Sequence, residues 1–443
     1  MGTAVRSVDQ GRPHAGTLLR LLRDPMRALD EIAARSAGAV VRLDLGLFRP
    51  YLVTRPEHVQ QVLRDRAANY RRDGMMWRPM RRLLGDGIAG EGGAWAQHRR
   101  LVQPAFTARQ VDALVDRIAE VVGAAVEAGP TGEPVDAYRE MTRIVHQVVR
   151  RIFFADRVTL GEVDRLGAAT TGILAALASR MVLPFMPDWV PLPGDATFRR
   201  AARTADQILL PLIRAAREPG GDGADLVTRF TRSGGLDDEQ VRDDLVALFV
   251  AGTESTAVAL TWLWVLLDGD PEVAGRLHAE IAAVVGTGPV GRAHLPALRY
   301  TRMVLEEVLR LHPPGWLIPR VAAGPDDIDG VPVRAGDTVL VSPYLTHRLP
   351  GWWERPTVFD PERFAPERVA NRHPFAYFPF GAGPHRCLGS HFFTVEAQLI
   401  VAALLSRYRP RLAGGRLAGR RVVTARLGAS LRPRQRLRLV LAP

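Results

Sequence analysis

Cys387 offers the chain's widest choice of chemistry, because a thiolate can bind a metal ion or act as a nucleophile. It is the only cysteine among 443 residues and lies in the Gly-rich loop Phe378–Gly389, which reads FPFGAGPHRCLG. Gly383 and Gly389 permit backbone angles that other residues resist, so the loop can turn tightly and direct amide N–H groups at an anion. A small buried thiol without reactivity is the alternative.

Residue types alone leave these alternatives open. A zinc site needs several Cys or His ligands at set spacing, and this pattern is not present around Cys387. A cysteine nucleophile needs a histidine base and an orienting partner, and His385 is too near in sequence for its geometry to be inferred. Metal ligation, nucleophilic catalysis and an inert thiol all remain possible at this point.

A second polar cluster interrupts the apolar stretch Leu245–Leu267. Its residues Ala251–Thr256 read AGTEST. Gly252 costs about 1 kcal/mol of helix propensity, and a buried Glu254 is costly unless it is paired. In the simplest interpretation Ser255 bonds to the carbonyl one turn earlier and bends the helix, while Glu254 makes a salt bridge.

Two further pairs of residues lie one helical turn apart. Trp95 and Arg99 are four positions apart and therefore share one face of a helix. Glu307 and Arg310 have the spacing of a surface salt bridge. Taken alone, neither pair identifies a site.

The cysteine loop as a whole is more specific than its single residues. Phe380, Gly383, His385, Cys387 and Gly389 form the pattern F-x-x-G-x-H-x-C-x-G, which resembles the haem-binding loop of the cytochromes P-450. In that family the cysteine is the axial thiolate of haem iron and donates electron density that favours O–O cleavage. The resemblance covers nearly the whole chain and implies a monooxygenase with haem b (iron protoporphyrin IX) held by Cys387.

The resemblance also gives a role to the cluster in the apolar stretch. Ala251–Thr256 is similar to the family's A-G-x-[DE]-[TS] motif, in which a notch binds oxygen and an acid and an alcohol supply protons. Glu254 and Ser255 would be the acid and the alcohol, and Thr256, which follows them, is expected with them among the catalytic residues. Serine stands where threonine is usual, and its freer χ1 would orient water less strictly.

Further haem contacts follow from the resemblance. An arginine suits a haem propionate because its planar fork matches a carboxylate. The residues implied to contact haem are Trp95, Arg99, Ala251, Gly252, Arg320, Phe380, Gly383, His385 and Gly389. Glu307 and Arg310, followed by His312-Pro-Pro, resemble the family's structural charged pair, with Arg363 as third member. We expect these three to support folding and the cysteine loop, not catalysis.

The residues expected to face substrate are nearly all apolar, which indicates a lipophilic molecule. They are Met75, Met76, Trp77, Met181, Phe185, Phe249, Trp316, Leu317 and Ile318. The region from Leu83 to Phe106 is similar to that of bacterial family members acting on terpenes, so a sesquiterpene-like hydrocarbon is the leading expectation. A fatty acid would require a cationic anchor, and a macrolide would require more polar groups.

The composition is that of a globular chain, with 47% hydrophobic residues. A single cysteine excludes a disulfide framework and suits a reducing, cytoplasmic location. The first 16 residues contain no apolar core of signal-peptide length. Leu245–Leu267 is long enough to cross a bilayer. With Glu254 near its middle, we expect instead a helix buried in the protein core, and no membrane span.

The net charge of +12 is concentrated near the C-terminus. All 59 basic residues are arginine; eleven of them, and no Asp or Glu, follow Glu396, which leaves 48 basic against 47 acidic residues before that point. Among these arginines only Tyr408 is aromatic, so base stacking has little support and we expect no nucleic-acid binding. Attraction of an acidic protein partner is the better interpretation.

The patterns predict a mainly α protein with a smaller β-rich region, the cytochrome P-450 fold. We expect one domain over 1–443, with an N-terminal arm over 1–23. Asp237 and Gln240 form a capping-box pattern that begins the long central helix, expected over haem. Other helices are expected at about 24–37, 56–63, from 95, 108–151, 160–183, 297–311 and from 392. Strands are expected at 40–45, 51–53 and 437–441, a hairpin over 329–341, and irregular structure over 67–93.

With no flavin or iron–sulfur module in the sequence, electrons are expected from a separate ferredoxin or flavodoxin with its reductase. This partner would dock near Cys387, guided by Arg100 and Arg386, on a monomeric enzyme. Two other functions stay open. A peroxide-driven enzyme is disfavoured because such relatives lose the acid–alcohol pair, and a non-catalytic haem-thiolate sensor is disfavoured because no signalling module is recognisable.

Overall fold

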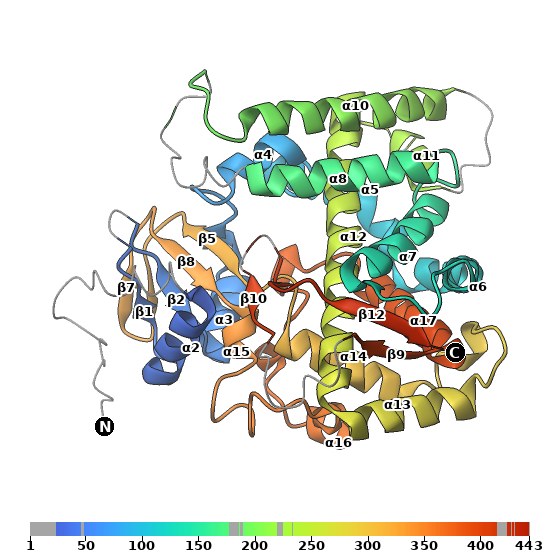
Figure 1. Cartoon of the computed structure of the whole chain (residues 1–443). Coiled ribbons are helices and arrows are strands. Elements are labelled where there is room, and N and C mark those ends of the chain that lie inside the picture. The colour runs from blue at the N-terminus through green and yellow to red at the C-terminus, as the bar shows by residue number, and fades with distance from the viewer. Residues whose placement is uncertain are drawn as a thin grey trace. The chain divides into compact units, whose positions relative to one another are not determined.

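A computed structural model of the chain describes residues 24–45, 48–176, 186, 189–218, 225–232, 234–413, 423–426, 428 and 430–442 (Figure 1). The predicted arm over 1–23 and the predicted substrate residues Met181 and Phe185 lie outside the described residues. The chain divides into two compact units. The first comprises 1–74, 306–387 and 425–432, and the second comprises 75–305, 388–424 and 433–443.

Helices make up most of the described chain, as the sequence predicts. The first unit contains α2 (Pro25–Ser36), α3 (Pro56–Gln60), α15 (Pro343–Thr346) and α16 (Pro366–Val369). The second contains α4 (Arg78–Leu84), α5 (Gly92–Val102), α6 (Ala108–Glu127), α7 (Ala137–Ile152), α8 (Leu160–Ala176), α10 (Asp195–Arg217), α11 (Leu226–Arg232), α12 (Asp238–Gly269), α13 (Pro271–Val284) and α17 (Ser390–Arg407). Helix α14 (Arg299–Leu311) runs from the second unit into the first.

The first unit is built around a five-stranded sheet in the order β1-β2-β8-β5-β3. Its strands are β1 (Val41–Arg42), β2 (Tyr51–Val53), β3 (Tyr70–Arg71), β5 (Ile318–Ala322) and β8 (Thr338–Val341). Strands β2 and β8 are parallel, and the other pairs are antiparallel. Val53, Val339 and Val341 are fully buried in its core, where β-branched side chains pack well on a pleated surface.

The predicted hairpin over 329–341 is partly wrong. Strand β6 (Asp326–Ile328) pairs with β7 (Val331–Val333). Asp329 and Gly330 form the turn between them at φ +55° and +80°, as a tight antiparallel hairpin requires. The segment Thr338–Val341 instead belongs to the five-stranded sheet. Its neighbours in that sheet are β2, which lies near the N-terminal end of the described chain, and β5, which precedes the β6–β7 hairpin. The pattern within a segment does not show which strands it pairs with.

The central helix α12 of the second unit has 32 residues and begins at the predicted capping box. The Asp237 side chain accepts the N–H of Gln240 at 2.8 Å, and the Gln240 side chain accepts the N–H of Asp237 at 3.0 Å. Within the described residues, α12 is the one helix long and apolar enough to cross a membrane, and 72% of its most apolar window is buried in the protein. This burial favours the predicted core helix.

The rest of the second unit packs around α12. Helices α7, α10 and α17 all contact it, and Figure 1 shows α8 and α10 running side by side. A three-stranded sheet has the order β4-β12-β9, formed by β4 (Val135–Asp136), β12 (Arg438–Ala442) and β9 (Arg409–Leu412). The C-terminal strand is therefore confirmed. The short strands β10 (Ala425–Arg426), in the first unit, and β11 (Arg432–Pro433), at the boundary between the units in the sequence, form a further pair.

Two predicted boundaries differ from the structure. The helical pattern over 108–151 is two helices, α6 and α7, because the Gly129–Gly132 segment contains a proline and places Gly132 at φ +77°. The region 67–93, predicted to be irregular, contains the strand β3 and the helix α4. A proline in the first turn of α4 is compatible with a helix start, because that N–H needs no intrahelical acceptor.

Candidate active site

The cysteine loop is held in shape by its own backbone hydrogen bonds. Cys387 N–H donates to Phe380 O at 2.9 Å, and Arg386 N–H donates to Gly383 O at 3.1 Å. Gly381 and Gly383 have φ of +66° and +68°, a region that side chains disfavour. The expected backbone freedom is therefore needed at Gly383, whereas Gly389 has an ordinary φ of −82° as the residue that caps α17.

Gly383 is also required by a close approach between two backbone segments. A β-carbon at this position would overlap the carbonyl oxygen of Leu63. Leu63 lies in the turn Gln61–Asp65 that follows α3, and both segments belong to the first unit. The loop is thus fixed against the segment that follows α3, and this approach excludes a larger residue at position 383.

Cys387 is exposed in this loop. Cysteine is among the residue types most often found fully buried, so its exposure here argues against the inert buried thiol. Within the described residues, no group of three or more His, Cys, Asp or Glu side chains could hold a metal ion.

Other predicted residues of the first unit lie in or beside β5. Arg320 is buried in β5 and donates to Pro319 O at 2.8 Å. Leu317 and Ile318 are half-buried. Trp316, also half-buried, donates from its indole N–H to Gly428 O at 2.9 Å. The backbone oxygen of His385 accepts from Arg72 Nη2 at 3.4 Å.

The cluster in α12 belongs to the second unit. Ala251 is exposed although most of the helix around it is buried, and Gly252, Glu254 and Ser255 are half-buried. The Ser255 hydroxyl donates to Ala251 O at 2.5 Å, which confirms the predicted bond one turn back along the helix. Ala251 and the acid–alcohol pair Glu254–Ser255 are therefore less buried than most of the helix.

Thr256 leads to a functional candidate that the sequence analysis missed. Its hydroxyl donates to Gly252 O and to Glu396 Oε2, both at 3.1 Å. Glu396 lies on α17 with 0% exposure, and its Oε1 has no hydrogen-bond partner among the described residues. Burial raises the pKa of Glu396 to about 8, and the hydrogen bond from Thr256 acts in the opposite direction. Glu396 is therefore protonated at neutral pH. The signal for Glu396 in the sequence was an acidic residue within the apolar, helix-like pattern that follows Cys387.

The predicted haem-propionate pair on α5 also lies in the second unit. The Arg99 guanidinium is 5.9 Å from the centre of the Trp95 ring, and Arg99 Nε donates to Gln103 Oε1 at 3.1 Å. Both Trp95 and Arg99 are half-buried. The structure therefore brings this pair together on one helix face, as the spacing predicts.

The predicted charged network is assembled within the first unit. Glu307 and Arg310 have 0% exposure and are joined by two hydrogen bonds of 2.6 and 2.8 Å. Arg363 Nε lies 3.5 Å from Glu307 Oε1, and the N–H of Asp360 donates to the same oxygen at 2.9 Å. Burial raises the pKa of Glu307 while Arg310 opposes this. These contacts tie α14 to the segment around Asp360.

The predicted substrate residues are divided between the two units. Met75, Met76 and Trp77 are half-buried just before α4 in the second unit. Phe249 has 0% exposure and packs against the rings of His146 and Phe154, so the structure places it in the core of that unit.

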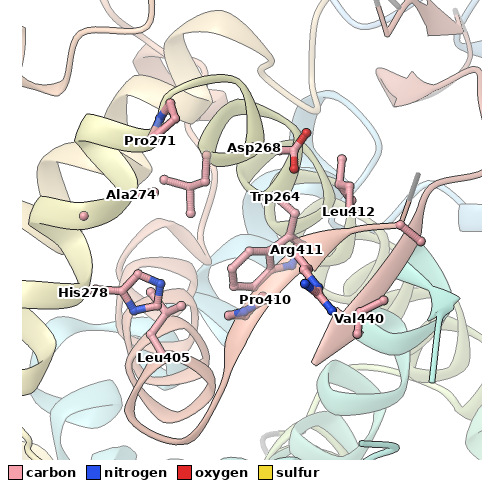
Figure 2. A pocket seen from close by; sticks show the side chains of 13 residues that line it. Trp264, Asp268, Pro271, Ala274, His278, Leu405, Pro410, Arg411, Leu412 and Val440 are labelled. Atoms are coloured by element: carbon pink, nitrogen blue, oxygen red, sulfur yellow. The ribbon is translucent and has the colours of Figure 1, made fainter. Parts of the chain in front are cut away.

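A pocket of about 700 Å³ lies at the C-terminal end of α12 (Figure 2). It is lined from α12, α13, α17, β9 and β12, and its polar side chains are Asp268, His278 and Arg411. Burial lowers the pKa of His278, and the nearby Arg409 lowers it further. None of the residues predicted to contact haem, oxygen or substrate lines this pocket, so it is distinct from the candidate site.

Comparison with known proteins identifies a family and a fold. The family model for cytochrome P-450 matches residues 9–417. The chain is 34% identical over 419 residues to cyclooctat-9-en-7-ol 5-monooxygenase of Streptomyces melanosporofaciens, covering 93% of this chain and 89% of that protein. It is 29% identical over 417 residues to pentalenene oxygenase of Streptomyces avermitilis, covering 92% and 91%.

The crystal structure of the cytochrome P450DA heme domain is similar to this chain with a TM-score of 0.84. It covers 98% of this chain and 96% of the other at 21% identity. At this identity the likeness shows the fold alone, and it confirms the fold class expected from the sequence.

Proposed function

The chain belongs to the cytochrome P-450 family and is an oxidoreductase of the monooxygenase kind, and from this we propose its cofactor ligand, substrate class and electron source. Cys387 is the axial thiolate ligand of haem b. The enzyme inserts one atom of O₂ into a lipophilic, terpene-like molecule. Electrons come from a separate ferredoxin or flavodoxin with its reductase.

The exposed thiol of Cys387 carries this proposal. It is the only cysteine of the chain, in a loop fixed by backbone hydrogen bonds and by the approach of Gly383 to Leu63. Thiolate-ligated haem supplies the activation of O₂, because the thiolate donates electron density that favours O–O cleavage. A rigid loop suits this ligand, because it places the sulfur without a further ordering cost.

The other residues fit a haem with two propionates. Trp95 and Arg99 on α5, and Arg320 and His385 in the first unit, offer N–H donors of the type that binds carboxylates. Ala251 on α12 is exposed, and its small side chain would leave room beside a planar cofactor. We assign these residues to cofactor binding on their chemistry and on the family resemblance.

Proton handling is assigned to α12. The Ser255 hydroxyl donates to Ala251 O, which leaves the serine oxygen as an acceptor. Glu254, the residue before it, is half-buried. On the family resemblance we assign proton uptake to Glu254 and proton transfer toward bound oxygen to Ser255. Thr256 is held by Gly252 and Glu396 and orients this segment of the helix.

The terpene-like substrate is supported by two observations. The half-buried residues Met75, Met76, Trp77, Leu317 and Ile318 are apolar, and two curated relatives are named for the oxidation of cyclooctat-9-en-7-ol and pentalenene. An apolar pocket discriminates weakly between hydrocarbons of similar size, so the class is proposed and not a single compound.

An absorption titration of the purified haem protein tests the substrate class. Terpene hydrocarbons, saturated fatty acids and a macrolide are added separately while the Soret band is followed. We expect a saturable low-spin to high-spin shift with the terpenes alone. A saturable shift with fatty acids or the macrolide, and none with terpenes, would contradict the assignment. Absence of any haem band in correctly folded protein would overturn the proposed cofactor as well.

A further inference from the structure

One buried carboxylate joins three parts of the second unit. Asp244 on α12 accepts the backbone N–H of Ile88 through Oδ1 at 2.8 Å. Its other oxygen, Oδ2, lies 2.6 Å from Nδ1 of His98 on α5. The side chains of His98 and Asp244 are 3% and 1% exposed. The Gly85–Ile88 segment, α5 and α12 therefore meet at a single ionisable group.

The Gly85–Ile88 segment is shaped to enclose this carboxylate. A β-carbon at Gly87 would overlap Asp244 Oδ1 and would lie 2.7 Å from His98 Nδ1. A β-carbon at Gly85 would overlap the carboxylate of Asp243, and Gly85 has φ +60°. Glycine at both positions allows the backbone to approach the acidic side chains of α12 more closely than any other residue could.

Hydrogen bonding compensates for the burial of the His98–Asp244 pair. The hydrogen bond to Asp244 raises the pKa of His98, although burial acts in the opposite direction. A buried carboxylate without partners would be costly, whereas this one accepts from a backbone N–H and an imidazole. Removing one partner of a buried pair leaves the other uncompensated, so the three parts are expected to separate together when either residue is lost.

We propose that His98 and Asp244 are positioning residues that fasten the Gly85–Ile88 segment and helix α5 to α12. Neither residue is assigned a contact with substrate or cofactor. The inference rests on the proposed function in one respect: α5 carries Trp95 and Arg99, which are assigned to haem propionates. Through α5, the pair sets where these two donors lie within the second unit.

Hydrogen–deuterium exchange of the full-length protein tests the fastening directly, because the Ile88 amide donates to Asp244. We expect this amide to exchange at least tenfold faster in Asp244→Ala than in wild type, and less so in Asp244→Asn, which keeps an acceptor oxygen. Asp268→Ala, the same change elsewhere on α12, is the matched control and should leave Ile88 unchanged. Equal Ile88 exchange in Asp244→Ala and Asp268→Ala would overturn the proposal.

A second variant and a second readout keep the test decisive. If Asp244→Ala does not fold, His98→Gln is measured at the same amide, and unchanged exchange there would also overturn the proposal. In the haem-loaded protein, His98→Gln should weaken spectral binding of a terpene about tenfold while the thiolate-type spectrum is kept. The exchange result does not depend on haem, so failure of the fastening and failure of the proposed function give different outcomes.

Discussion

Among the ionisable groups near the α12 cluster, Glu396 is the one whose charge the fold alters most clearly. It is fully buried, accepts from Thr256, and has its pKa raised to about 8 by burial. The sequence placed it in an apolar helix pattern and gave no indication of its partner, which lies 140 positions away. A neutral carboxyl here keeps α17 and α12 in contact without burying a charge.

Replacing Glu396 with glutamine should change how stability depends on pH. From about pH 4.5 to 8 the unfolded chain ionises this group while the folded protein retains the proton. The stability that the Glu396 carboxyl contributes is therefore fully present below about pH 4.5, and it is lost as the pH rises through about 8. The loss is on the order of 4–5 kcal/mol at most.

Urea denaturation of wild type and Glu396→Gln at a series of pH values measures this effect. We expect the free energy of unfolding to fall less steeply with pH in the variant, since its amide does not titrate. Parallel pH profiles for the two proteins would show that Glu396 is ionised in the folded state.

Ser255 stands where the family motif usually has threonine, and its hydroxyl is held by Ala251 O. Ser255→Ala removes the hydroxyl and should reduce the fraction of electrons that reach product by several-fold, with more peroxide released. Ser255→Thr keeps the hydroxyl, restricts χ1, and should match or exceed wild type. Coupling is measured as product formed per reductant consumed; unchanged coupling in Ser255→Ala would contradict the assigned proton transfer.

At the scale of elements, the sequence predicts what depends on neighbouring residues. The capping box at Asp237 and Gln240, the paired face of Trp95 and Arg99, and the C-terminal strand are all local patterns that the structure confirms. The pairing of β8 with β2 and the approach of Gly383 to Leu63 join segments that are far apart in sequence. Periodicity carries no information about such pairings.

The charged network of α14 is predicted to control the stability of the first unit. Arg310→Met leaves Glu307 buried beside a more distant Arg363, and should lower the free energy of unfolding by about 3–5 kcal/mol. Asp237→Ala, which removes one helix cap, should cost about 1 kcal/mol. Urea denaturation of wild type and of both variants measures the two losses in the free energy of unfolding. The Glu307→Gln, Arg310→Met double variant should recover part of the loss; a cost at Arg310 no larger than at Asp237 would contradict the structural role.

At the scale of the whole chain, the excess of arginine bears on the redox partner. Arg100 and Arg386 are exposed, and the net charge is +12. An acidic ferredoxin or flavodoxin would associate faster through electrostatic attraction, and salt would weaken this effect. The expected charge surplus follows from the sequence alone, whereas the surface that a partner would contact does not.

Charge reversal of these arginines tests that attraction. Arg386→Glu and Arg100→Glu, made separately, should each slow reduction by the partner several-fold at low ionic strength and have little effect at high ionic strength. Arg27→Glu, at an exposed arginine on α2, serves as the control. Stopped-flow reduction rates give the comparison, and rates that are unchanged at low salt in both variants would exclude steering by these residues.

The assignment of Cys387 is tested most directly by the absorption spectrum of the reduced carbonyl complex. Wild type and the nearby hydroxyl deletion Ser390→Ala should both give the spectrum typical of a thiolate-ligated haem. Cys387→Ser should bind haem more weakly and lose this spectrum, because no other cysteine is present in the chain. Persistence of the thiolate-type spectrum in Cys387→Ser, or its absence from haem-loaded wild type, would contradict the account.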